Sequence, residues 1–197
     1  MEKIEKTAEE GDSMKLTNLA IFTLASSIGS FASGLLGPFY VVYVQQIGGS
    51  IQNLGIAFGL LIIAQSFASY FVGKYSDVFG RKPFLIVSGY VASAIILTYT
   101  LIRTVLELYV LQIFFGITNA IYMTVSIAFL GDATEMGKRG LQIGKYRTVV
   151  GVFAGFSMII GGMVIGKFGF QIIFYVVSLF FFIATSLLFL IKERRTG

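Results

Sequence analysis

The sequence predicts an all-α membrane protein with six transmembrane helices, and two properties of its composition support this fold class. Hydrophobic residues make up 56% of the 197 residues and charged residues only 13%, about half the charged share of a typical soluble domain. From Leu16 to Gly73 the chain carries no charge over 58 positions, whereas one membrane-crossing helix needs roughly 20 residues. Backbone amides in hydrocarbon must be hydrogen-bonded within their own segment, so we expect these stretches to be helices.

A polar, glycine-rich run at 45–53 divides the first long apolar stretch into two spans, as turn residues do. We expect a cytoplasmic tail at 1–16, a six-helix transmembrane domain at 17–192 and a short cytoplasmic end at 193–197. The expected spans are about 18–44, 53–74, 84–102, 107–130, 144–166 and 170–191.

The basic residues predict the orientation. Thirteen of the fifteen fall on one side of this topology, and only Arg103 and Lys167 fall on the other. Cytoplasmic loops of membrane proteins carry the excess of Lys and Arg. We therefore expect a multi-pass protein of the plasma membrane with both termini in the cytoplasm.

The composition also excludes several functions. The chain has no Cys and no His, and so lacks thiolate and imidazole ligands and the usual proton carrier near neutral pH. No span contains a nucleophile with a base or a pair of carboxylates. We expect no enzyme activity, catalytic residue, metal or cofactor. Because the positions of the basic residues are explained by topology, we also expect no nucleic-acid partner.

The chain resembles itself when it is shifted by 89 residues. Gly73 then falls on Gly162, and Gly80 falls on Gly169 with a Phe before each. The shift superposes spans 2 and 3 on spans 5 and 6, which predicts an inverted repeat of three spans plus three. With 23 glycines in the chain, chance matches are the alternative.

The connection between spans 2 and 3 contains Gly73, Asp77, Gly80, Arg81 and Lys82. At this spacing the sequence resembles the major facilitator superfamily, whose signature in this loop is Gly-x-x-x-Asp-x-x-Gly-Arg-Lys/Arg. After span 4, Asp132, Arg139 and Gly140 are similar to a second family pattern. The resemblance implies that Asp132 and Arg139 reach the Asp77 loop and form a cytoplasmic latch that opens and closes during transport. The alternative is that these charges only set the topology.

Two positions depart from the drug–proton antiporters of that family. Gln112 stands where those proteins carry an Arg, and the window 157–162 lacks their Gly-Pro pair. Both departures argue against that branch.

The resemblance places spans 1 and 4 along a central cavity. Tyr40, Gln65, Gln112 and Asn119 are the candidate ligand contacts, because polar side chains in lipid are costly without a partner or water. The alternative, which we favour for the Ser and Gly stripe at 26, 30, 33 and 37 of span 1, is close helix packing. We also assign Gly151 and Gly155 to packing.

The resemblance covers residues 16–195 and corresponds to half of the usual twelve-span family member. It implies secondary active transport of a small solute by alternating access. The bilayer and a second six-helix half would be the partners, and that half is a second copy, a homologue or a missing C-terminal half. The alternatives are a non-transporting scaffold subunit and a truncated fragment of a twelve-span transporter.

Overall fold

The computed structural model describes residues 2–192, with side chains from Ser13 onward, and every regular element in that part of the chain is a helix. The elements are α1 (Glu2–Leu36), η1 (Gly37–Phe39), α2 (Tyr40–Gln46), α3 (Ile51–Phe79), α4 (Arg81–Thr98), α5 (Val105–Ala133), α6 (Arg139–Phe168), α7 (Phe170–Leu187) and η2 (Leu188–Leu190). The predicted all-α class is confirmed. The predicted cytoplasmic end at 193–197 lies outside the described residues.

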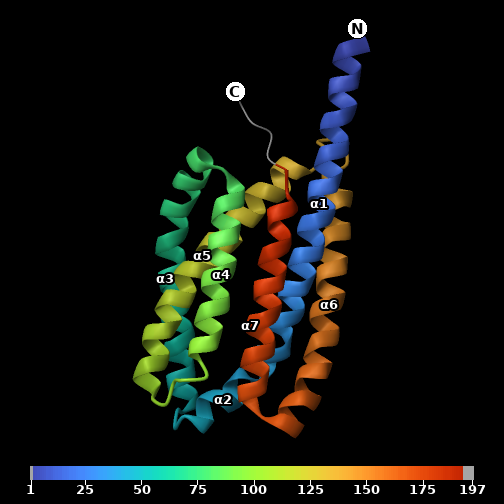
Figure 1. Ribbon diagram of the computed structural model, residues 1–197. Helices are drawn as coiled ribbons and strands as arrows, with labels where there is room; N and C mark the ends of the chain where they lie inside the picture. The colour runs from blue at the N-terminus through green and yellow to red at the C-terminus, as the bar shows by residue number, and fades with distance from the viewer. Residues whose placement is uncertain (1, 193–197) are drawn as a thin grey trace.

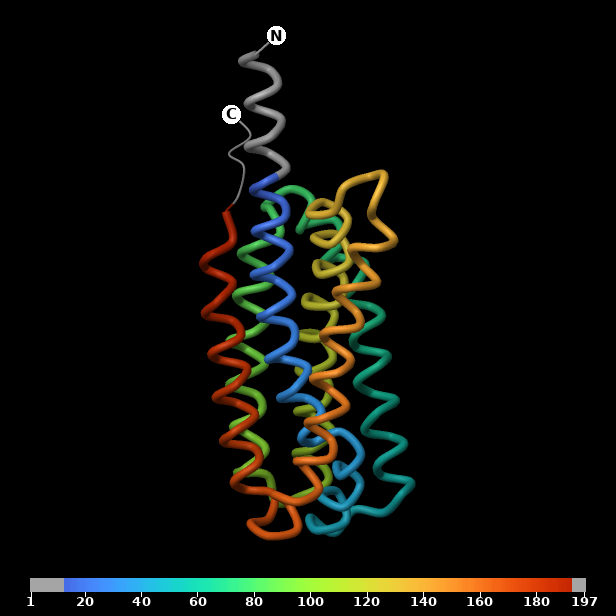
Figure 2. Tube along the Cα trace, turned by 90° about the vertical axis from the view of Figure 1, so that its right-hand side faces the viewer, coloured from blue at the N-terminus to red at the C-terminus, as the bar shows by residue number. Residues whose placement is uncertain are grey.

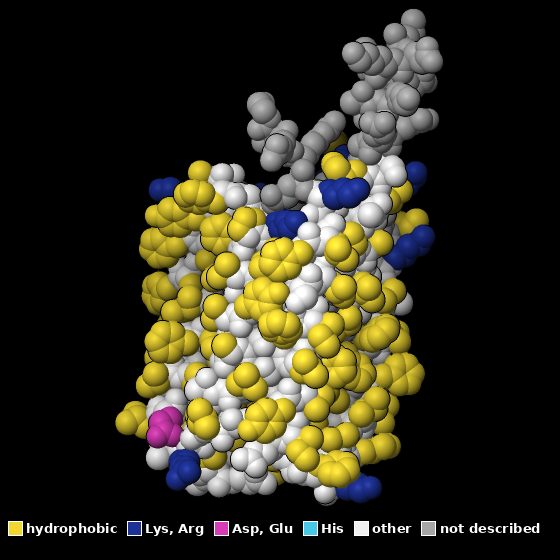
Figure 3. All heavy atoms as spheres, in the orientation of Figure 1, with side chains coloured by type: hydrophobic (Ala, Val, Ile, Leu, Met, Phe, Trp, Pro, Cys, Tyr) yellow, Lys and Arg dark blue, Asp and Glu magenta, His cyan; other side chains and the backbone are white. Residues whose placement is uncertain are grey.

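Six segments are long and apolar enough to cross a membrane: Ser13–Gln46, Ile51–Phe79, Arg81–Thr98, Val105–Ala133, Arg139–Phe168 and Phe170–Leu190. They run the length of one bundle in two perpendicular views (Figures 1 and 2). Hydrophobic side chains cover the face shown in Figure 3, and basic side chains gather at its two ends. The prediction of six transmembrane helices is confirmed.

The first span contains a break at a position where the sequence predicted one continuous helix over 18–44. α1 ends at Leu36, and Gly37–Phe39 form a 3₁₀ turn before α2 begins at Tyr40. Pro38 explains the break, because proline has no backbone N–H to donate and its ring crowds the preceding turn. After α2, the side chains of Ser50 and Asn53 form a capping box that starts α3,.

Helix packing follows the inverted repeat that the 89-residue shift predicted. The helix pair α3–α5 corresponds to the pair α6–α1, and the pair α1–α7 corresponds to the pair α5–α4. The pair α4–α7 corresponds to itself. Exchanging the first three spans with the last three leaves this set of pairs unchanged. Gly80 and Gly169, which the shift superposes, also share a backbone conformation, with φ of 88° and 78°. Glycine adopts positive φ at little cost, so both copies of the repeat turn in the same way.

Two glycines bring helices into backbone contact. A Cβ at Gly116 of α5 would clash with the carbonyl group of Leu61 in α3, and a Cβ at Gly161 of α6 would clash with that of Leu35 in α1. Small residues allow such close approach between membrane helices. The packing role expected for Gly151 and Gly155 is wrong within the described chain, since a Cβ at either position would meet open space.

Gly116→Ala should therefore destabilise the bundle by about 1–3 kcal/mol, the usual cost of overpacking, because α5 must move away from α3. Thermal unfolding in detergent measures the effect. Gly151→Ala is the matched control, since it adds the same methyl group where there is room. Equal unfolding temperatures for the two variants would contradict the assignment of Gly116 to a backbone contact.

Candidate functional site

Three charged side chains meet where α3 ends and α4 begins. A nitrogen of Arg81, the first residue of α4, lies 2.5 Å from a carboxylate oxygen of Asp77. Another lies 3.3 Å from an oxygen of Asp132, near the end of α5. The guanidinium also donates to Ser76 Oγ at 3.0 Å. The turn at Gly80 reverses the chain and so places Arg81 beside the last turn of α3.

One cation thus joins three helix ends. The Arg81 side chain is 23% exposed, whereas those of Asp77 and Asp132 are each 66% exposed. Ion pairs at this degree of exposure contribute about 0–1 kcal/mol each. The cluster can therefore hold α3, α4 and α5 together with contacts that are weak enough to break and form again.

Lys82 binds the end of the last span. Its Nζ donates to the carbonyl oxygens of Phe189 at 2.8 Å and Ile191 at 2.6 Å, at a helix end where carbonyl groups lack partners. Asn18 of α1 closes the same corner through two hydrogen bonds with the backbone of Lys192, at 2.8 and 3.0 Å. The sequence analysis missed Asn18, because a single amide in an apolar span has no spacing that indicates its partner.

We expected Arg139 to reach the Asp77 loop, but its described hydrogen bonds are with the end of α5. Its guanidinium donates to the carbonyl oxygen of Gly131 at 2.9 Å and to Thr134 Oγ1 at 3.2 Å. Both acceptors lie at the end of α5. Arg139 therefore caps α5, a local role at the helix end that precedes it.

The two remaining glycines of the motifs also lie outside the cluster. Gly73 lies inside α3, where a Cβ would rest 3.8 Å from the Thr124 side chain of α5. Gly140 lies in the first turn of α6 and faces open space. Of the predicted gate residues, the structure thus joins Asp77, Arg81 and Asp132 directly.

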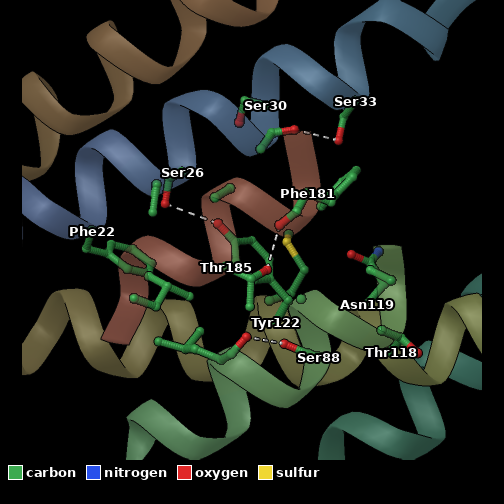
Figure 4. A pocket seen from close by; sticks show the side chains of 18 of the residues that line it. Phe22, Ser26, Ser30, Ser33, Ser88, Thr118, Asn119, Tyr122, Phe181 and Thr185 are labelled. Carbon is green, nitrogen blue, oxygen red and sulfur yellow. Dashed lines mark hydrogen bonds between the residues drawn. The ribbon is translucent and has the colours of Figure 1, made fainter. Parts of the chain in front are cut away.

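A cavity of about 260 Å³ lies inside the bundle between α1, α4, α5 and α7 (Figure 4). Its lining is mostly apolar, and none of the described lining residues is acidic or basic. Polar lining side chains include Ser26, Ser30, Ser33, Ser88, Thr118 and Thr185. The three serines of α1, for which packing was the favoured interpretation, therefore face this cavity.

Asn119, one of the candidate ligand contacts, lines the same cavity. Its Nδ2 donates to Gln65 Oε1 of α3 at 3.0 Å. Gln65 is not among the described lining residues. Its hydrogen bond with Asn119 fixes the orientation of the Asn119 amide.

A second cavity of about 190 Å³ adjoins the first and shares Ser33, Phe115 and Phe181 with it. Tyr40 and Gln112 line this cavity. The Gln112 side chain is only 2% exposed, donates to the Tyr40 hydroxyl at 2.9 Å and accepts from the Tyr99 hydroxyl at 3.1 Å. Because both ends of this amide are bound, Gln112 fixes the shape of the cavity wall.

Metal ligands are sparse in this structure. Among the described residues there is no group of three or more Asp, Glu, His or Cys side chains that could hold a metal ion.

Comparison with known proteins identifies the family. The model of the Major Facilitator Superfamily matches residues 22–197. The chain is 29% identical over 154 residues to the MFS-type transporter YitZ of Bacillus subtilis, which covers 78% of this chain and 94% of YitZ. It is 24% identical to the MFS-type transporter MJ1560 of Methanocaldococcus jannaschii, over 80% of this chain and 41% of that protein.

A third relative carries a more specific name. The multidrug resistance protein MdtG of Proteus mirabilis is 25% identical over 85% of this chain and 44% of its own length. The chain thus spans nearly all of YitZ but less than half of MJ1560 and MdtG. Together with the six apolar helices, these matches show that the chain belongs to the Major Facilitator Superfamily of membrane transporters.

Proposed function

We propose that the chain forms one six-helix half of a secondary transporter that moves a small solute by alternating access. The observation that carries the proposal is the Arg81 bridge between Asp77 and Asp132. This bridge lies at one end of a bundle that encloses an uncharged cavity. The family relationship points to a transporter rather than an enzyme.

In this proposal the charged cluster is a gate. Breaking the Arg81 contacts frees the ends of α3 and α5 from α4, and forming them again closes that end of the bundle. The difference in contacts between the two states sets their populations. We assign the gate to Gly73, Asp77, Gly80, Arg81, Lys82, Asp132, Arg139 and Gly140, with Lys82 and Arg139 fixing the helix ends around the ion pairs.

We further propose that solute binds at the central cavities. Asn119 is the direct contact, because it lines the larger cavity. Tyr40 and Gln112 line the smaller one, and Gln65 positions Asn119. Gln112 and the window 157–162 depart from the pattern of the drug–proton antiporters. We therefore still expect that this chain does not belong to that branch.

The proposed partner is a second six-helix half, supplied by a second copy, a homologue or a C-terminal half. α3 and α6 form the two edges of the bundle in Figure 1, and in Figure 2 both lie on the side away from α4 and α7. Only 17% and 11% of their apolar stretches are buried, against 50% in the first span. These helices offer the surface that a second half or lipid would cover. MJ1560 and MdtG, of which the chain spans less than half, are long enough to hold two such halves.

The proposed site of action is the plasma membrane, with both termini in the cytoplasm. The described ends of α1 and of the last span lie together, joined by Asn18 and Lys192. The bases Lys74, Arg81, Lys138 and Lys145 belong to that same end, as the positive-inside rule requires of a cytoplasmic face.

The gate can be tested without knowing the solute, because the natural chain has no Cys. A single Ser30→Cys reports access to the cavity through its labelling by a membrane-impermeant maleimide. Asp77→Asn or Asp132→Asn should raise the labelling rate from the gate end by up to about fivefold, since each removes up to about 1 kcal/mol of closure. Insertion and yield should stay normal.

Glu135→Gln is the matched control, because the described contacts of the Glu135 carboxylate are with Lys138 at 3.3 Å and Gln142 at 3.5 Å and not with the Arg81 cluster. It should leave the labelling rate unchanged. An unchanged rate in both Asp variants would refute the gate and leave a scaffold subunit as the better interpretation.

The topology makes a separate prediction. Reporters fused to the N-terminus and to the C-terminus should both be active only on the cytoplasmic side, because the basic ends of the helices are retained there. A signal from the opposite side of the membrane for either fusion would overturn the orientation.

A further inference from the structure

Most hydroxyl groups that line the larger cavity use their hydrogen within their own helix. Four of the hydroxyls that line it donate their hydrogen to a carbonyl oxygen of their own helix. The bonds are Ser33 to Gly29 at 3.1 Å, Ser88 to Leu85 at 3.1 Å, Thr118 to Phe114 at 2.9 Å and Thr185 to Phe181 at 2.7 Å. Figure 4 shows this arrangement on α1, α4 and α7. A hydroxyl has one hydrogen and two lone pairs, so while these four groups keep their helix bonds they offer a ligand acceptors and no donors.

The amide of Asn119 has the same polarity. Its nitrogen donates to Gln65 at 3.0 Å, which leaves Oδ1 as the unbound end. In Figure 4 this oxygen lies on the side of the other lining residues. The bond to Gln65 fixes the amide in this orientation, so Asn119 offers the cavity an acceptor.

Few donors remain. Ser26 and Tyr122 share one hydrogen bond of 3.1 Å, so this pair keeps one hydroxyl hydrogen. Ser30 and the second amide hydrogen of Asn119 are the others among the described lining groups. Most of the other lining side chains, including Phe22, Phe115 and Phe181, are apolar. The cavity is thus an apolar chamber with a clear excess of acceptors.

We propose that this cavity selects uncharged, mainly apolar solutes that bring O–H or N–H donors. This inference rests on the proposed transport function and names the substrate class. A donor on the solute satisfies an oxygen that is otherwise unpaired on the cavity side, whereas an acceptor-only solute finds little to bind. A full charge is disfavoured because no described lining residue is acidic or basic, and a desolvated charge without a partner is costly. The volume of about 260 Å³ suits a solute of one or two rings.

Matched ligands test the donor preference directly. The natural chain has no Trp, so Phe181→Trp places a single reporter at the wall that the two cavities share, and the valine variants below assign its signal to the larger cavity. The probes are 4-nitrobenzyl alcohol, its methyl ether and the 4-nitrobenzyl trimethylammonium ion, whose nitro groups quench the reporter. The alcohol should bind about fivefold more tightly than the ether, the usual effect of one hydrogen bond, and the ammonium ion should bind most weakly.

Valine substitutions locate the acceptors. Thr118→Val and Thr185→Val keep the side-chain shape but remove the oxygen, and each should reduce the preference for the alcohol. Thr98→Val is the matched control, because Thr98 donates to its own helix in the same way, to Ala94 at 3.1 Å. Thr98 is not among the described residues that line this cavity, so its substitution should leave the preference unchanged. Phe67→Trp, on a ring that is 73% exposed, measures partition into the detergent.

Equal binding of alcohol and ether, tightest binding of the ammonium ion, or no binding of any probe would overturn the inference. A second reporter, Phe115→Trp on α5, gives an independent measurement if Phe181→Trp unfolds the chain. Binding is measured in the purified chain and needs no transport. Loss of the donor preference with a normal gate response would therefore reject the substrate class and leave the proposed function standing.

Discussion

The structure depends on one constraint, which is that a polar group inside the hydrocarbon must find its partner within the chain. The described side chains meet it in three ways. Hydroxyls such as Thr185 bond to their own helix. Buried amides pair with side chains of other elements, as Gln112 does with Tyr40 and Tyr99. Charges such as Arg81 lie at the ends of the spans, where water is available. These solutions fix the cavity and the charged cluster.

The inverted repeat places these features relative to one another. Matched helix pairs form the two sides of the bundle, and Gly116 and Gly161 bring α5 onto α3 and α6 onto α1. Because α1 packs closely on α6 and α5 packs closely on α3, the space between α1 and α5 is bordered by α4 and α7. The result is a cavity at the centre of the bundle. Gly116 and Gly161 thus determine where helices touch closely, and the cavity lies where they do not.

The sequence predicted the features that depend on composition and spacing. Uncharged stretches showed the spans, and the motif from Gly73 to Lys82 indicated that Asp77 would find a base, which is Arg81. Features that depend on which helices become neighbours could not be derived. Arg139 has a carbonyl within its own reach and binds it in preference to the Asp77 loop. Gly151 and Gly155 have the spacing of a packing motif but face open space. The break at Pro38 had a visible cause, but the length of the apolar stretch concealed it.

The two turns of the repeat have the same backbone but different chemistry. Gly80 is followed by Arg81 and its ion pairs, whereas Gly169 is followed by Phe170, whose ring lies 5.8 Å from that of Tyr43. Dissolved salt screens exposed ion pairs, while contacts between apolar rings weaken on cooling. Ionic strength and temperature therefore act on contacts at opposite ends of the same bundle, so that the two ends can be loosened independently of each other.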